Sequence, residues 1–359
     1  MKRPVLVKRE KPLPGGQAIA FLVGVVVALA AGALLLWLSG SDPVEVYERM
    51  WESSLGSRSG IEATLVRAVP LTLAGLAVAV AGSMGLWNIG AEGQIMAGAI
   101  GAAWVARIGE TWTGPVLITV MIIGGMVGGL LWMLGPALAR AHLGVNEIIT
   151  TLMLNEVAIR LAIYLIQGPW KDPESLGFPV ATPLPDQAQL PFLFGDVHIG
   201  VIIAVALVAI VALLINRTPW GYELRVAGSS QAAARYAGIS LKRKVLVVLL
   251  LSGTIAGIAG AVELSASSRL TENLSNGYGF AGIIVAALAL MRPWAIVPVA
   301  IVFGAVQVGG NAIRTLDVSS AVSNVLQAMI LFGALVVAVF MMYRVRWVAR
   351  EAEVTEAVT

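Results

Sequence analysis

The sequence predicts an all-α membrane protein of about ten transmembrane helices, and three observations lead to that fold class. Hydrophobic residues make up 58% of the 359 residues and charged residues only 13%, whereas a soluble domain carries about 25% charged residues. The mean hydropathy is +0.86. The apolar residues gather in runs of about 20, and a bilayer admits such runs only as helices.

The runs that are long enough to cross a bilayer follow one another along the chain. They are Ala18–Leu38, Ala63–Ala81, Leu86–Ala106, Pro115–Leu134, Val145–Ile166, Val197–Ile215, Val245–Val262, Tyr278–Met291, Ala295–Ala312 and Val322–Met342. Among these, Tyr278–Met291 is short for a span. Polar residues and several glycines interrupt Leu86–Ala106, which predicts a locally broken helix.

The basic residues between the runs predict the orientation. Lys and Arg in segment 1–17 precede a first run that is too long for the apolar region of a signal peptide, so we expect a retained helix and a cytoplasmic N-terminus. With ten spans the C-terminal tail 347–359 is cytoplasmic as well, and 18–346 forms the transmembrane domain. The external side then collects only Arg49, Arg58, Arg107, Lys171, Arg269 and Arg314, as the positive-inside rule requires.

Two loops between spans are unusually long. Segment 169–196 is expected outside and is stiffened by prolines. Segment 217–244 is expected in the cytoplasm and is polar, basic and rich in Gly and Ala. A short helix is predicted within it, because Ser229 or Ser230 can cap Gln231–Ala237 and Gly238 can end it.

This cytoplasmic segment has two interpretations, a solvated charge run or a docking element for a cytosolic partner. Small side chains with an arginine and a tyrosine at the rim suit insertion into a groove on another protein, which favours docking. The candidate docking residues are Gly221, Arg225, Gly228, Ala233, Ala234, Arg235, Tyr236 and Gly238.

Polar residues within two of the spans are candidates for a substrate pathway. They are Asn88, Glu92 and Gln94 in the interrupted run, and Thr151 and Asn155 in the run that follows Gly144. Polar groups are costly in lipid, so they should face the protein interior. They either line a polar path or bond a tightly packed helix to its neighbours, and the sequence does not decide between the two.

Two further patterns accompany these residues. Glu156 and Arg160 are spaced i, i+4 within one span and are expected to form a structural ion pair. The stretches that begin at Asn88 and Asn276 both place an Asn and close-set glycines at the start of an irregular span. This is a weak internal echo of the broken-helix repeats that transporters use.

No catalytic apparatus can be recognised. The chain has no P-loop, no zinc-protease motif, no nucleophile elbow and no Cys. His142 and His198 lack companions at ligand spacing, so neither a catalytic nor a metal site is expected. Nothing indicates a nucleic-acid partner. An ion-coupled secondary transporter using Glu92, Glu156 and Glu263 remains the alternative to a partner-driven transporter.

Three motifs together resemble the membrane subunit of an ATP-binding-cassette (ABC) importer of the simple-sugar and nucleoside branch. Gly221-Tyr-Glu-Leu-Arg225, Gly228-Ser229 and Ala233-Ala-Arg-Tyr-Ala-Gly-Ile239 look like that family's coupling loop. The stretches Asn88-Ile-Gly-Ala-Glu-Gly-Gln94 and Gly144-Val-Asn-Glu-Ile-Ile-Thr-Thr-Leu-Met-Leu-Asn155 look like its nucleoside-type members.

This resemblance implies a permease of the bacterial cytoplasmic membrane without a cofactor of its own. ATP and Mg would be bound by a cytosolic ATPase, and a second permease and an external substrate-binding lipoprotein would complete the transporter. The chain departs from the family pattern at Ser230-Gln-Ala232, where Asn-Pro-Glu is usual, at Glu156, and at the turn Met291-Arg-Pro-Trp294. The implied substrate is a nucleoside, or else a pentose or other sugar.

Overall fold

The computed structural model describes residues 2–8, 16–175, 179–316 and 343–349, with scattered positions between 322 and 336. The chain falls into two compact units. One comprises Met1–Trp51 and Gly309–Thr359, and the other comprises Glu52–Val308.

The first unit contains elements from both ends of the chain. Strand β1 (Lys2–Lys8) pairs antiparallel with β4 (Tyr343–Ala349), and helices α1 (Gly16–Leu38) and α2 (Pro43–Ser54) lie between them in the sequence. The hydroxyl of Tyr47 in α2 donates to the carbonyl of Leu29 in α1 at 2.7 Å. About half of the predicted span Val322–Met342 and most of the tail 347–359 lie outside the described residues.

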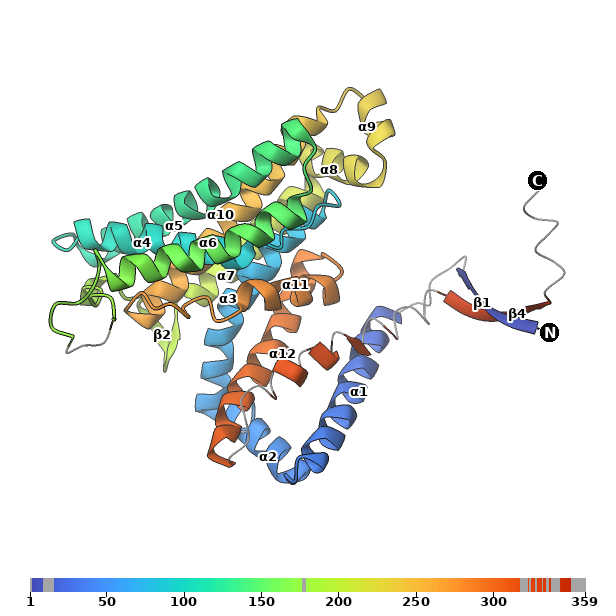
Figure 1. The fold of residues 1–359 in the computed structure, drawn as a ribbon, viewed down its shortest axis with the longest axis horizontal. Coiled ribbons are helices and arrows are strands. Elements are labelled where there is room, and N and C mark those ends of the chain that lie inside the picture. The colour runs from blue at the N-terminus through green and yellow to red at the C-terminus, as the bar shows by residue number, and fades with distance from the viewer. Residues whose placement is uncertain are drawn as a thin grey trace. The chain divides into compact units, whose positions relative to one another are not determined.

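The second unit is a helical bundle (Figure 1). In chain order its elements are α3 (Arg58–Gly82), α4 (Ala91–Ile108), α5 (Gly114–Leu138), the π-helical turn Ala139–Leu143, α6 (Glu147–Gln167), the 3₁₀ turn Asp186–Ala188, strands β2 (Phe192–Phe194) and β3 (Val197–His198), α7 (Gly200–Arg217), α8 (Pro219–Ser229), α9 (Gln231–Tyr236), α10 (Leu241–Ser267), α11 (Tyr278–Leu288) and α12 (Pro293–Ala312). Helix α12 continues beyond the unit boundary into the 3₁₀ turn Ile313–Leu316.

Every predicted span before Val322–Met342 overlaps a helix. Among the described residues, six helices are long and apolar enough to cross a membrane, and Leu22–Leu38 and Tyr278–Leu288 are shorter apolar helices. The six are Arg58–Gly82, Gly114–Leu143, Glu147–Gln167, Gly200–Arg217, Leu241–Ser267 and Pro293–Leu316. Ten spans and cytoplasmic termini therefore stay a prediction.

The centre of the bundle is packed through glycine. A Cβ added at Gly125 of α5 would lie 2.7 Å from the carbonyl oxygen of Gly257 in α10, and one at Gly253 would lie 2.7 Å from that of Gly129. These backbones approach each other because no side chain separates them. Within their apolar windows, α3 is 78% and α10 72% buried, whereas α6 is only 22% buried. Helices α3 and α10 are therefore central, and most of α6 is uncovered.

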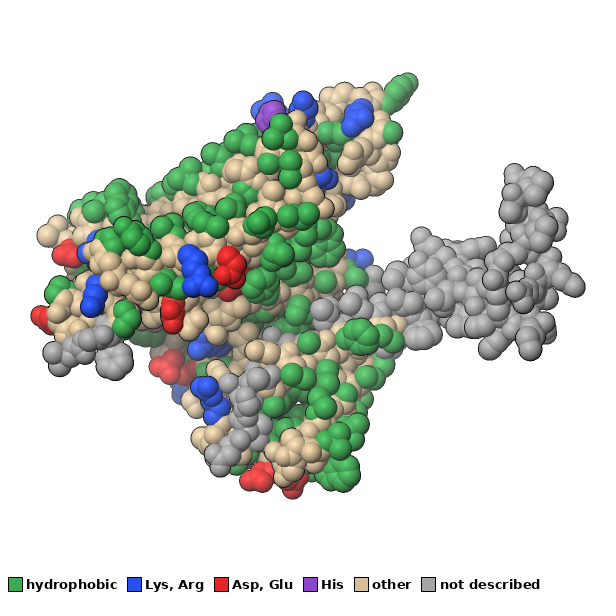
Figure 2. All heavy atoms as spheres, viewed as in Figure 1, with side chains coloured by type: hydrophobic (Ala, Val, Ile, Leu, Met, Phe, Trp, Pro, Cys, Tyr) green, Lys and Arg blue, Asp and Glu red, His purple; other side chains and the backbone are tan. Residues whose placement is uncertain are grey.

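The loop predicted to be external packs onto one end of the bundle. Ala181, Leu184 and Ala188 join the apolar cluster of α4, α5, α6 and α10. The backbone amide of Leu184 donates to Ser268 at 2.9 Å, and Ser265 donates to the carbonyl of Ala188. Figure 2 shows basic side chains at the opposite end, which carries α8 and α9.

Candidate functional site

A closed network of hydrogen bonds holds Asn88 and Gln94 where the chain turns into α4. The amide of Asn88 donates to Gln94 Oε1 at 2.7 Å and accepts from Gln94 Nε2 at 3.0 Å. Asn88 also donates to Ser252 Oγ at 2.8 Å, and the Ser252 hydroxyl in turn donates to the carbonyl of Ala77 at 2.6 Å. Both amides are buried, at 0% and 1% exposure. The network therefore ties the start of α4 to α3 and α10.

Glu92 holds the start of α11. Its two carboxylate oxygens accept from the backbone amides of Gly277 at 3.0 Å and Gly279 at 2.7 Å. A carboxylate at this position satisfies otherwise unpaired amides and complements the positive end of the helix dipole. The stretches that begin at Asn88 and Asn276, which echo each other in the sequence, thus meet in space. Helix α11 has only 11 residues, as expected for a broken span.

Asn155 joins α6 to the same region. Its Oδ1 accepts from the amide of Gly93 at 2.9 Å, and its Nδ2 donates to the carbonyl of Ile89 at 2.9 Å. One turn earlier, Thr151 donates to the carbonyl of Glu147 at 2.6 Å. A Cβ at Gly93 would lie 2.9 Å from the Cα of Asn155, so glycine is required for this close approach.

The residues considered for a substrate pathway are thus brought together, but they are bonded to the chain itself. Asn88, Glu92, Gln94, Thr151 and Asn155 are all buried, with at most 4% exposure. Of the two interpretations that the sequence left open, this geometry favours the one in which they fasten packed helices together. A path through this chain in this conformation would have to avoid them.

Glu263 and Arg67, both within spans, also have partners. Arg67 lies 3.8 Å from Glu263 Oε1 and donates to the hydroxyl of Tyr278, which is fully buried. No partner for Arg67 could be predicted from the sequence, because the three residues come from α3, α10 and α11. With Glu92 capping α11 and Glu263 paired, two of the three carboxylates named for ion coupling have structural roles.

The loop that the sequence predicts to be cytoplasmic contains two helices rather than one. Thr218 caps α8 by accepting from the amide of Gly221 at 3.1 Å, and Pro219 follows at the first helical position. Ser230 then caps α9 by accepting from the amide of Ala233 at 3.2 Å. Helix α9 ends at Tyr236, and Gly238, with φ +76°, follows its cap Ala237 as the predicted terminating glycine. The pattern Thr218-Pro219 is a helix-start signal, but α8 was not among the helices predicted from the sequence.

The residues predicted for docking divide into two groups. Ala233, Arg235 and Gly238 are exposed, and Tyr236 is 98% exposed. Ala234, in contrast, is fully buried, so its side chain faces the loop's own interior and is closed to a partner in this conformation. A docking role for Ala234 stays a prediction, and its burial has a structural reason, because a six-residue helix is held mainly by packing one of its faces.

The remaining three candidates, Gly221, Arg225 and Gly228, hold the loop against neighbouring parts of this chain. A Cβ at Gly221 would lie 2.6 Å from the Cα of Ile215, and one at Gly228 would lie 3.0 Å from the carbonyl carbon of Met84. Arg225 donates to the carbonyl of Ile215 at the end of α7. These contacts fasten α8 against the bundle.

The predicted ion pair in α6 is not formed. Glu156 and Arg160 are both exposed, and within the described residues no ion pair joins them. The i, i+4 spacing permits the pair, but at an exposed position it gains little over the cost of ordering two long side chains. Two charged residues therefore lie uncovered on a helix of mean hydropathy 1.6.

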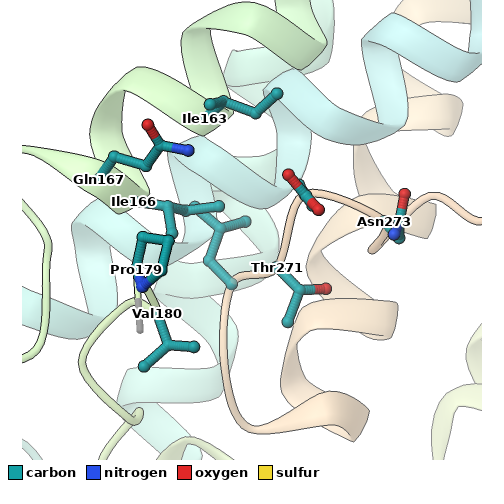
Figure 3. A pocket seen from close by; sticks show the side chains of 9 residues that line it. Ile163, Ile166, Gln167, Pro179, Val180, Thr271 and Asn273 are labelled. Atoms are coloured by element: carbon teal, nitrogen blue, oxygen red, sulfur yellow. The ribbon is translucent and has the colours of Figure 1, made fainter. Parts of the chain in front are cut away.

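A cavity of about 380 Å³ lies at the end of the bundle that carries the loop predicted to be external. Figure 3 shows Ile166, Pro179 and Val180 on one side, and Thr271 and Asn273 on the other, from the connection between α10 and α11. Gln167 also lines the cavity. Among the described residues, no group of three His, Cys, Asp or Glu side chains could hold a metal ion.

Comparison with known proteins identifies the class. A family described as "Branched-chain amino acid transport system / permease component" matches residues 60–340. The glucose ABC transporter permease protein TsgB13 of Haloferax volcanii is 37% identical, over 89% of this chain and 88% of its own. The guanosine ABC transporter permease protein NupP of Bacillus subtilis is 32% identical, over 87% and 92%. The nucleoside ABC transporter permease protein NupB of Lactococcus lactis is 30% identical, over 87% and 88%.

The chain belongs to this family of transport permeases, because the match covers most of its length. It is the membrane-spanning permease subunit of an ABC importer. The resemblance of its three motifs to ABC importer permeases is confirmed, and an ion-coupled secondary transporter is not favoured.

Proposed function

We propose that this permease forms half of the path by which an ABC importer brings a nucleoside into the cytoplasm. A separate cytosolic ATPase would bind ATP and Mg and drive transport by docking on the α8–α9 loop. The observation that carries this proposal is the loop itself, a pair of capped helices fastened to the bundle. It presents Ala233, Arg235 and Tyr236 outward.

Rigidity makes this loop suitable for transmitting motion. Both helices begin at a side-chain cap, Glu223 forms an ion pair with Lys244 at the start of α10, and Arg225 bonds to the end of α7. A displacement of α9 by a partner would therefore move α7 and α10 as well. A flexible, solvated charge run could not transmit such a displacement.

Co-purification of the ATPase tests the docking role. We expect Ala233→Trp to overpack the docked groove at a cost of about 1–3 kcal/mol, or roughly 5- to 150-fold in affinity. Arg235→Glu should weaken docking in a salt-dependent manner. Glu174→Trp and Lys171→Glu, exposed on the external loop, are the matched controls. Normal co-purification and transport in both loop variants would contradict the proposal.

The exposed charges of α6 support a second permease subunit. A charged side chain facing lipid at mid-helix is costly, yet Glu156 and Arg160 are uncovered near the middle of Glu147–Gln167. A second subunit, identical or different, would cover them and share a polar path. With ten spans and cytoplasmic termini, the complete transporter would lie in a bacterial cytoplasmic membrane and receive substrate from an external binding lipoprotein.

The cavity at the external end supports a nucleoside as substrate. Ligand sites are mostly apolar with a few placed polar groups. Here the apolar wall of Ile166, Pro179 and Val180 suits a base, and Gln167 and Asn273 can hydrogen-bond a ribose or base edge. A simple sugar is the second candidate, because the glucose permease is 37% identical to this chain.

Uptake into proteoliposomes with the complete set of partners distinguishes these substrates. Labelled guanosine should accumulate with ATP, insensitive to a protonophore, and Gln167→Leu or Asn273→Leu should raise its KM. The exposed Gln189→Leu, which does not line the cavity, should leave it unchanged. Glucose uptake that guanosine fails to inhibit would establish the sugar instead. Uptake without ATP would contradict both.

A further inference from the structure

A second cavity, of about 440 Å³, lies beneath the α8–α9 loop. It forms where the ends of α3 and α7 and the middle of α8 meet the turn between α11 and α12. Its polar lining includes two guanidinium groups, Arg225 and Arg292, with Asn216 and Ser83. Met291 and Trp294 contribute apolar and aromatic surface.

The charge in this cavity is uncompensated. None of its lining residues is acidic, and Arg292 has no ion-pair partner within the described part of the chain. Glu223, the acid of the adjoining helix, is already paired with Lys244. Arg225 uses one donor on Ile215, and a guanidinium carries five. Helix α12 begins at Pro293, so the positive end of its dipole adds to the positive electrostatic potential of the cavity.

The turn that carries Arg292 is held in an unusual conformation. Leu290 and Met291 both have positive φ, 53° and 57°, which side chains other than glycine rarely adopt. Hydrogen bonds from Met291 to Ala286 at 2.8 Å and from Arg292 to Ala289 at 3.0 Å maintain the turn. Such strain persists where the surroundings fix it, often at functional sites. Here its effect is to place Arg292 beside the cavity.

The surroundings of the cavity are those of a membrane surface. Trp294 is 57% exposed, and Leu213 on the last turns of α7 and Leu290 on the turn are 59% and 46% exposed. Exposed apolar residues flanking two cations suit acyl chains attached to an anionic head, and Trp is typical of the bilayer interface. A soluble anion would gain nothing from this apolar flank.

We propose that this cavity binds the phosphate headgroup of an anionic phospholipid, from the leaflet on which the α8–α9 loop lies. The two arginines hold the phosphate, and the acyl chains lie against α7 and the turn before α12. A bound lipid would join α7, α8 and α12, and would fix the base of the loop.

Native mass spectrometry of the purified permease tests this site with phosphatidylglycerol and, for comparison, phosphatidylcholine. We expect preferential retention of phosphatidylglycerol. In Arg225→Gln/Arg292→Gln that retention should fall roughly 25-fold, since each basic residue near an anionic leaflet contributes about 1 kcal/mol and 1.4 kcal/mol is tenfold. Arg243→Gln, an exposed basic residue nearby that does not line the cavity, should retain the lipid.

Three results would overturn the proposal. Equal retention of both lipids would show that the net negative charge of the headgroup is not recognised, since phosphatidylcholine carries the same phosphate with a compensating choline cation. Displacement of phosphatidylglycerol by millimolar inorganic phosphate would show a soluble-anion site. Unchanged lipid retention with loss of the ATPase would assign the arginines to the protein interface. If the double variant does not fold, Arg292→Lys, which keeps the charge and loses the bidentate geometry, should bind with an intermediate affinity.

Discussion

Replacing Glu92 distinguishes a structural polar cluster from a transport pathway. Its carboxylate is 4% exposed and accepts from the amides of Gly277 and Gly279. In Glu92→Gln one oxygen remains for one amide, while the new NH₂ group faces the other donor. In Glu92→Ala both amides lose their acceptor and the start of α11 is uncapped.

The structure sets the size of the effect. A hydrogen bond to a charged group contributes about 1.5–3 kcal/mol, and a buried donor left unpaired carries a further desolvation penalty. Glu92→Gln should therefore cost about 1.5–3 kcal/mol and Glu92→Ala about 3–6 kcal/mol. Either is a large fraction of the 5–15 kcal/mol typical of folded proteins.

Thermal unfolding in detergent, abundance in the membrane and ATP-driven uptake per folded molecule together form the assay. We expect Tm and abundance to fall in the order wild type, Glu92→Gln, Glu92→Ala, while uptake per folded molecule stays near normal in Glu92→Gln. Glu110→Gln, an exposed carboxylate beyond the far end of α4, should change nothing. A Glu92→Gln protein with unchanged Tm and no uptake would refute this reasoning and assign Glu92 to transport.

Further predictions concern packing, pH and orientation. Gly125→Val should lower Tm, because its Cβ would lie 2.7 Å from a backbone oxygen of α10, whereas Gly135→Val, with no atom within 4 Å, should not. Burial lowers the pKa of His198, so the unfolded chain takes up a proton at a higher pH than the folded one. The free energy of unfolding should therefore be highest above pH about 6.5 and fall at lower pH. Unfolding scans of His198→Asn should show a smaller decrease at low pH. Because the chain has no Cys, single cysteines at Ser240 and Gln187 should label from opposite membrane faces; labelling of both from one face would contradict the proposed topology.

The parts of the fold that could be predicted from the sequence are those that depend on residues close together in the chain. Helix α9 is capped by Ser230 and ends before Gly238 as expected, because a cap and a left-handed glycine act within one turn of chain. The same reasoning applied to Thr218-Pro219 would have predicted α8. Apolar runs located the helices of the bundle for a similar reason, since length and hydropathy are properties of each run alone.

Partners distant in sequence could not be predicted in this way. The sequence indicated that the side-chain amides of Asn88 and Gln94 need hydrogen-bond partners. Only the fold shows that these amides bond to each other and that Asn88 bonds to Ser252. Periodicity likewise allowed a Glu156–Arg160 pair, and the fold leaves both uncovered. Hydropathy locates a helix along the chain without fixing which of its faces is covered, because that depends on neighbours far away in the sequence.

The distribution of polar groups bears on where the path runs. A path through a single chain would need polar side chains that face an internal channel, yet the buried amides and carboxylates of α4 and α6 all bond to the chain itself. Charged groups face outward instead, on the uncovered side of α6. Such groups are stable in a membrane only against water or another polar surface. On the proposed function, the path therefore runs along the outer face of α6, between this chain and a second permease.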